Sequence, residues 1–152
     1  MLTTSAAALL LSSCAGDEGT LSAAGLPSSG AVELAISETC ADTAVEGCVS
    51  TAGDSVTLPT DFERVGVTEA VTVDEGGQNA VGLTLSVDGA TTLAAVTQRV
   101  ADAGPDARLV VKIGDDLLSA VRVVDAVRTD FVVVALPSSE NPDDVIDIIR
   151  NS

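Results

Sequence analysis

The stretch from Ala80 to Arg122 changes its hydrophobic period, and this change predicts the order of its elements. Apolar residues alternate with small or polar ones over Val81–Val87, which indicates a strand with one buried face. The period then lengthens to about 3.6 residues, so we expect a helix over Asp88–Ala103, with Asp88 as its candidate N-cap. Gly104-Pro105 ends that helix, because glycine adopts a left-handed conformation readily and proline cannot continue the helix.

A hairpin is expected after this helix. Leu109, Val111 and Ile113 alternate with other residues and begin a strand. A turn at Gly114-Asp115-Asp116 reverses the chain into a second strand over Leu117–Val124. Two neighbouring strands joined by so short a turn must run antiparallel.

The flanking residues supply further strands and a second helix. Alternation predicts strands at Val32–Ile36 and Val67–Val73, the latter followed by a turn at Gly76-Gly77. Asp130–Leu136 is apolar on both faces, so we expect it to be a central strand. A helix is expected over Asn141–Arg150, because a proline and two aspartates suit its first turn.

These elements predict the fold class. At 152 residues the chain has room for one domain and a short leader. We expect a single α+β domain over residues 31–152, with an antiparallel-rich sheet and both helices packed on one face.

The charge of the chain limits its partners. Seven basic residues face 23 acidic ones, which gives a net charge of −16. Such a field repels a phosphate backbone, so nucleic-acid binding is disfavoured. It also repels anionic lipid headgroups, so attachment to a membrane needs another cause.

The N-terminus offers such a cause. Residues 1–13 form an apolar leader, and Leu11-Ser12-Ser13-Cys14 resembles the lipobox of bacterial lipoproteins, in which the cysteine is lipidated. This resemblance implies an anchor at Cys14 and a location on the outer side of the cell membrane. Residues 14–30 are mostly small, polar and rich in glycine, so we expect a flexible tether there. The leader lacks a basic residue and its apolar run is short, which an upstream start codon would explain. The alternative is an N-terminal segment with a chance cysteine.

Cys40 and Cys48 remain as a pair. They could close a small loop as a disulfide in an oxidising compartment, which would stabilise the fold by about 2–3 kcal/mol. Two reduced thiols or a metal site are the alternatives, although the chain has no histidine and so lacks ligands for a tetrahedral zinc site.

The run from about Val67 to Arg150 resembles the extracytoplasmic head subdomain of SecD, the membrane subunit that assists protein export. The resemblance is carried by VGLTLSVDGATTLAAVTQRV, by LVVKIGDDLLSAVRV and by the closing SSENPDDVIDIIRNS. It implies a SecD-head-like fold and motifs that are structural rather than catalytic. The chain departs from the family in having Asp115-Asp116 where Asp-Gly is usual and Val121 in place of a proline. No transmembrane segments follow this region in the sequence, so we do not expect the export subunit itself.

Catalytic chemistry is poorly supported. There is no histidine, and neither Ser-x-x-Lys nor Gly-x-Ser-x-Gly occurs, so Ser119 is expected to pack in a strand. One group of aspartates, Asp115, Asp116 and Asp125, could attract calcium, although it lacks the spacing of a calcium loop. A second group, Asp143, Asp144 and Asp147, is expected to lie on a solvated helix face. We therefore expect no enzyme, no catalytic residue, no bound metal and no cofactor.

Two functions remain in view. The first is a lipid-anchored module that binds an extracytoplasmic polypeptide or envelope protein through a sheet edge or a helix–sheet groove, linked to protein export or envelope assembly. The second is a lipoprotein that binds a small ligand or a metal, and a hydrolase is the weakest alternative. An exposed strand edge would favour the first function, and a large apolar cavity would favour the second.

Overall fold

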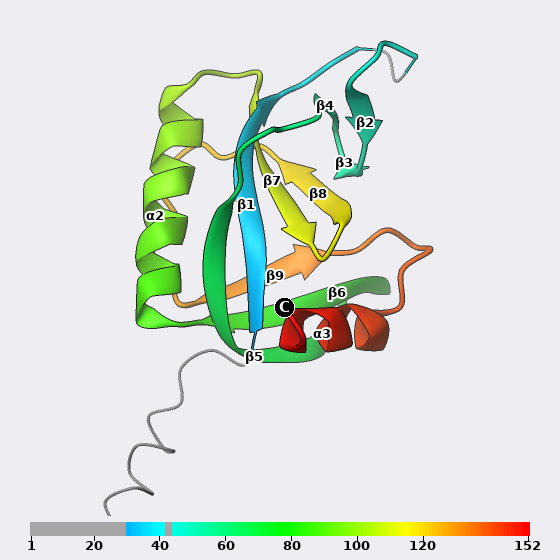
Figure 1. Ribbon diagram of the computed structural model, residues 1–152, viewed down its shortest axis with the longest axis vertical. Helices are drawn as coiled ribbons and strands as arrows, with labels where there is room; N and C mark the ends of the chain where they lie inside the picture. The colour runs from blue at the N-terminus through cyan, green and yellow to red at the C-terminus, as the bar shows by residue number, and fades with distance from the viewer. Residues whose placement is uncertain (1–29, 42–43) are drawn as a thin grey trace, which may run out of the picture.

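The computed structural model describes residues 30–41 and 44–152 and shows one strongly curled sheet with two helices against it (Figure 1). Residues 1–29, including the predicted leader and Cys14, lie outside the described residues. In chain order the elements are β1 (Gly30–Glu38), β2 (Cys48–Ser50), β3 (Ala52–Gly53), β4 (Ser55–Thr57), β5 (Glu63–Glu75), β6 (Gln78–Leu85), α2 (Val87–Asp102), β7 (Ala107–Ile113), β8 (Asp116–Val121), β9 (Phe131–Ala135) and α3 (Pro142–Arg150).

The sheet has seven strands in the order β3-β8-β7-β1-β5-β6-β9. Every neighbouring pair is antiparallel except β3 and β8, which pair in parallel over two residues. The predicted α+β class with a mostly antiparallel sheet is confirmed. A separate two-stranded sheet of β2 and β4 lies beside it.

Strand β5 determines the curl of the sheet. Its first part pairs with β1 and its second part pairs with β6 on the opposite edge, and the register shifts between Val67 and Glu69. A bulge of this kind bends a strand and increases its twist. It also changes the inward face, because Val65 and Val67 are buried before the shift whereas Ala70 is buried after it.

Helix α2 runs along β1, β5 and β7, and its buried apolar side chains are Leu93, Val96 and Val100. Its N-cap is Ser86, whose hydroxyl accepts a hydrogen bond from the Gly89 N–H at 3.0 Å. The predicted cap at Asp88 is therefore wrong, and this residue lies in the first turn instead. Ser86 caps the helix because it lies in extended backbone one residue before the first helical residue, where its hydroxyl oxygen reaches the free N–H groups of the first turn.

Helix α3 contacts β5, β1 and β6, and it is capped by the Asn141 side chain, which accepts from the Asp143 N–H at 3.0 Å. Both helices contribute to one large apolar cluster. The sheet curls so strongly that the prediction of both helices on a single face stays unconfirmed. Neither helix is long and apolar enough to span a bilayer, as far as the described residues extend.

The two hairpin turns follow the chemistry expected from the sequence. Gly76 and Gly77 both have positive φ, 63° and 87°, as a two-residue hairpin turn of type I′ requires. In the β7–β8 turn Gly114 takes the positive φ of 62°, whereas Asp115 does not. Only the first central residue needs positive φ in a type II′ turn, so the missing second glycine causes no strain.

Two strands differ from the prediction. Asp130–Leu136 was expected to be central, but among the described residues β9 is the last strand of the sheet and pairs only with β6. Phe131 and Val133 are accordingly 46% and 41% exposed. The strand expected over Leu117–Val124 ends at Val121, and the chain then runs without regular structure as far as β9.

The cysteine pair lies at the far side of the sheet from α2. A disulfide joins Cys40 to Cys48 across a Cα–Cα distance of 6.1 Å, in agreement with the predicted pairing. It connects the end of β1 to β2, and the β2–β4 pair covers a second apolar cluster of Ala35, Val56, Val110 and Ala120.

We predict that reduction of this disulfide lowers the melting temperature by roughly 10 °C without abolishing the fold, because an open loop restores about 2–3 kcal/mol of chain entropy to the unfolded state. Thermal melts followed by circular dichroism, with and without reductant, measure the change. A Cys40→Ser/Cys48→Ser variant is the control and should melt like the reduced protein whether or not reductant is present. Two titratable thiols at Cys40 and Cys48 in protein from its native compartment would contradict the bond.

Candidate binding groove between two sheet edges

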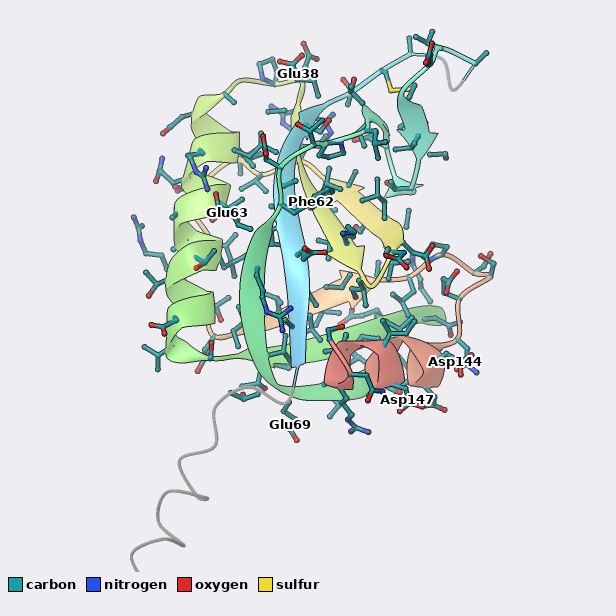
Figure 2. All side chains as sticks on the ribbon, viewed as in Figure 1. Glu38, Phe62, Glu63, Glu69, Asp144 and Asp147 are labelled. Carbon is teal, nitrogen blue, oxygen red and sulfur yellow. A yellow bond between two sulfur atoms is a disulfide. The ribbon has the colours of Figure 1, made fainter. Side chains whose placement is uncertain are left out.

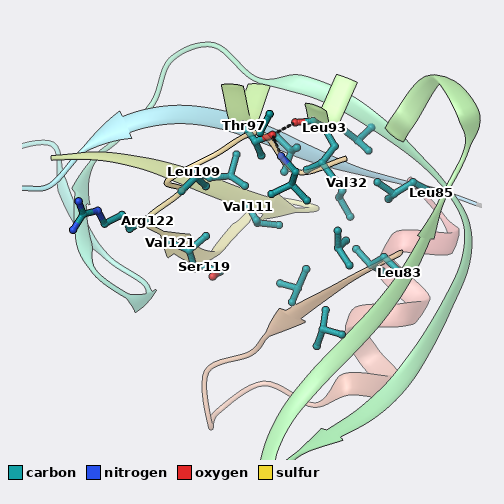
Figure 3. Close-up of a pocket in the computed structure, with 18 of the residues that line it drawn as sticks. Val32, Leu83, Leu85, Leu93, Thr97, Leu109, Val111, Ser119, Val121 and Arg122 are labelled. Atoms are coloured by element: carbon teal, nitrogen blue, oxygen red, sulfur yellow. Dashed lines mark hydrogen bonds between the residues drawn. The ribbon is translucent and has the colours of Figure 1, made fainter. Parts of the chain in front are cut away.

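The curl of the sheet leaves an apolar cavity of about 540 Å³ between α2 and the strands β8 and β9 (Figure 3). This volume lies within the range of about 300–1,000 Å³ that is usual for ligand pockets. Its floor is formed by core-facing aliphatic side chains, and the segment of residues 122–127 and β9 form its rim. The floor residues include Val32 and Leu34 of β1, Val65 of β5, Leu83 and Leu85 of β6, and Leu109 and Val111 of β7.

Thr97 of α2 holds the rim segment in place. Its side chain is fully buried, its hydroxyl donates to the Leu93 carbonyl at 2.7 Å, and it accepts from the Val127 N–H at 2.8 Å. One hydroxyl thus links the helix to an irregular segment that is 30 residues further along the chain. The cavity mouth depends on this bond because residues 122–130 have no regular secondary structure.

Strand β9 presents an unpaired edge beside the cavity. In its antiparallel register with β6, the hydrogen bonds from Leu85 N–H to the Asp130 carbonyl and from Leu136 N–H to the Asn79 carbonyl show which residues face β6. Backbone groups of alternate residues in such a pair face opposite edges. Those of Phe131, Val133 and Ala135 therefore point outward.

Only part of this outer edge lacks a partner. The Phe131 N–H donates to the Thr129 hydroxyl at 3.1 Å, and that hydroxyl is 3.2 Å from the Phe131 carbonyl oxygen. The described part of the chain offers no hydrogen bond to the outward groups of Val133 and Ala135. The free edge is therefore two residues long and lies directly at the cavity rim.

The rim is also unusually apolar for a solvent-exposed surface. Val121 at the end of β8 and Val124 in the following segment line the cavity, and they are 41% and 79% exposed. Val133 of β9 adds an apolar side chain that is 41% exposed on the opposite face of the same edge. Contiguous exposed apolar residues of this kind mark interaction sites more often than isolated ones do.

Ser119 of β8 places a single polar group at the junction between the cavity and a neighbouring hollow. The residue is only 3% exposed, and its hydroxyl makes no hydrogen bond within the described residues. None of the fully buried side-chain polar atoms in that part of the chain lacks a partner, so this hydroxyl is open to the groove. Ser119 was expected from the sequence to pack in a strand, and no motif around it indicated this position.

The other residues singled out from the sequence lie elsewhere or form no site. Cys40 and Cys48 do not line the groove, and Cys14 is outside the described residues. Lys112, the single lysine, bonds to Glu33 at 2.6 Å and lies over the Phe62 ring at 4.7 Å.

The aspartate groups are not assembled into a metal centre. Asp115 and Asp116 lie at the β7–β8 turn and Asp125 lies in the rim segment, and no group of three or more acidic, cysteine or histidine ligands forms within the described residues. Asp144 and Asp147 project from the outer side of α3, and Glu63 and Glu69 lie equally on the surface of β5 (Figure 2).

Comparisons with known proteins support the fold. No protein-family profile matches the sequence, and no curated protein matches it. Among solved structures the chain resembles SecDF in its super-membrane-facing form, with a TM-score of 0.52 and 16% identity over 91% of this chain. The chain spans 20% of the length of that protein. The SecD-like fold expected from the sequence is thus confirmed, whereas the lipobox and its anchor stay predictions.

We predict that Thr97→Val destabilises the protein by about 1–3 kcal/mol, because this nearly isosteric change leaves the Val127 N–H without its acceptor. Chemical denaturation measures the stability, and hydrogen exchange at the Val127 amide should accelerate more than exchange within β6. The control is Thr91→Val, since the exposed Thr91 hydroxyl bonds only to the Val87 carbonyl of its own helix. Equal effects of the two substitutions would contradict the role assigned to Thr97.

Proposed function

We propose that this protein is a non-catalytic binding module that accepts an extended, apolar segment of another polypeptide as an additional strand on the outer edge of β9. One observation carries the proposal. β9 is apolar on both faces, as central strands are, yet it lies at the edge of the sheet with Phe131 and Val133 exposed. An added strand would give it the neighbour that its sequence is suited to.

The groove supplies both parts of such recognition. Hydrogen bonds to the outward backbone groups of Val133 and Ala135 would fix the position of the bound segment without regard to its sequence. Each would contribute about 0.5–1.5 kcal/mol net. Apolar side chains entering the cavity would add about 25 cal/mol for each Å² that they bury. A site of this kind binds short segments reversibly.

The cellular setting is part of the same proposal. The SecD-like fold supports an accessory role in protein export or envelope assembly outside the cytoplasm, where polypeptides emerge in extended form. Cys14 would carry the lipid that holds the domain at the membrane. The net charge of −16 would keep the folded domain away from anionic headgroups, with the tether bridging the distance.

A small apolar ligand is the second candidate, because the volume of the cavity, about 540 Å³, lies in the range of ligand pockets. Such a ligand would fill the space between α2 and the sheet without hydrogen bonding to β9. The two candidates therefore differ in whether binding depends on the free backbone groups of β9.

We predict that Val133→Pro weakens the binding of extended apolar peptides at least tenfold while the protein stays folded. Proline removes the outward N–H, which β6 does not use, and proline is tolerated at edge positions of this type. Fluorescence anisotropy with a labelled peptide of alternating valine and threonine measures the affinity, and circular dichroism verifies the fold.

The matched control is Val133→Ala, which shortens the same side chain and keeps the N–H. It should bind with an affinity close to that of the wild type. If the wild type and the proline variant bind the peptide equally well, strand addition to β9 is refuted and binding of a small apolar ligand in the cavity is the remaining candidate function. Absence of peptide binding by the wild type would refute the proposed function as a whole.

We predict that the protein produced from its natural gene fractionates with membranes and that Cys14→Ser releases it into the soluble fraction, since two or more acyl chains anchor a protein stably. Immunoblots of separated fractions measure the distribution, and globomycin, an inhibitor of lipoprotein signal peptidase, should cause the precursor to accumulate. A wild-type protein found wholly in the soluble fraction would contradict the anchor.

A further inference from the structure

We infer that the groove selects a pattern of about five residues in the bound strand. Two aliphatic side chains of this pattern face the cavity, and the next side chain that faces it is polar and uncharged. Ser119 recognises that polar side chain. This inference rests on the proposed function, since it assigns the chemistry of the segment that would pair with β9.

The register of β9 defines which positions of a bound strand would face the cavity. Directly opposed residues in a ladder lie on the same face of the sheet. Positions opposite Val133 and Ala135 would therefore point to the exposed side. Positions opposite Val132, Val134 and Leu136 would point inward, because Val134 and Leu136 are buried in the core and Val132 packs against it.

The chemistry of the groove changes along these three inward positions. Val132 and Val134 border the apolar cavity, whose floor is aliphatic. Leu136 borders the neighbouring hollow of about 640 Å³, which contains the side chains of Gln78, Asn79, Ser119 and Ser138 and no charged residue. The first two positions would thus accept aliphatic side chains, whereas the third would accept a polar side chain without charge.

Ser119 is the polar group best placed to select at the third position. It pairs with Val111, which lines the cavity, so its side chain lies on the cavity face of β8, and it borders both hollows. The Ser119 hydroxyl is open to the groove and makes no hydrogen bond within the described residues, so a hydroxyl or amide on the bound strand would give it a partner. A charged side chain would be desolvated there with nothing to neutralise it.

The test uses labelled peptides with capped ends and the pattern Val-Thr-Val-Thr-X, together with the reversed order, because a strand could add in either direction. X is serine, asparagine, valine or glutamate. For the favoured order, wild-type protein should bind the serine and asparagine peptides about three- to tenfold more tightly than the valine peptide, the range that one neutral hydrogen bond provides. The glutamate peptide should bind most weakly.

Ser119→Ala should abolish the preference for serine and asparagine while leaving the affinity for the valine peptide unchanged. Its melting temperature should stay level, since the substitution removes no hydrogen bond made within the described residues, whereas a purely structural role would lower it. Ser138→Ala is the matched control in the same hollow and should keep the preference.

The outcomes separate the two proposals. If all four peptides bind equally and Val133→Pro still weakens them, the polar selectivity is overturned and the strand addition stands. If the preference disappears in Ser138→Ala but persists in Ser119→Ala, the assignment to Ser119 is overturned. If no peptide binds, both proposals fail together.

Discussion

The bulge in β5 is the constraint on which the rest of the structure depends. It allows one long strand to pair with β1 before the shift at Val67/Glu69 and with β6 after it, so that the sheet turns sharply within a single strand. The start of α2 is held at the same bend, because Ser86 N–H donates to the Gly66 carbonyl at 2.9 Å. Gly89 is required there, since a Cβ on it would lie 2.5 Å from that carbonyl oxygen. The bend in β5, the start of α2 and the floor of the cavity therefore form one structural unit.

A curled sheet that does not close has two edge strands, and in this protein the two edges are covered to different extents. β3 covers part of β8 through its parallel pairing at Ser119 and Ala120, and the Thr129 hydroxyl satisfies the start of β9. Val133 and Ala135 receive no such cover from the described residues. An uncovered apolar edge is an aggregation hazard that proteins usually blunt with charge, proline or a bulge. Its retention beside an apolar cavity is best understood if a partner strand occupies it.

Sequence reasoning succeeded where the cause of a structure is local. The helix ends at Gly104 and Asn141 and the turns at Gly76 and Gly114 follow from backbone preferences of single residues, and the structure has each of them. It failed where the cause is distant. The bulge between Val67 and Glu69 could not be located in a strand whose inward face is ambiguous in the sequence, and the bond from Thr97 to Val127 joins residues 30 apart. The groove could not be predicted because it exists only between edges that the bend brings together.

The edge position of β9 marks the candidate site. A run such as Phe131–Ala135, apolar on both faces, predicts a neighbour on each side, and the described residues supply only one. Either the apolar pattern of β9 has no functional meaning, or the second neighbouring strand comes from another polypeptide. A free edge of two residues offers few hydrogen bonds, so the affinity for that neighbour would depend mainly on side chains that fill the cavity. Such binding would be selective for apolar, extended segments yet weak enough to release them, as the proposed accessory role requires.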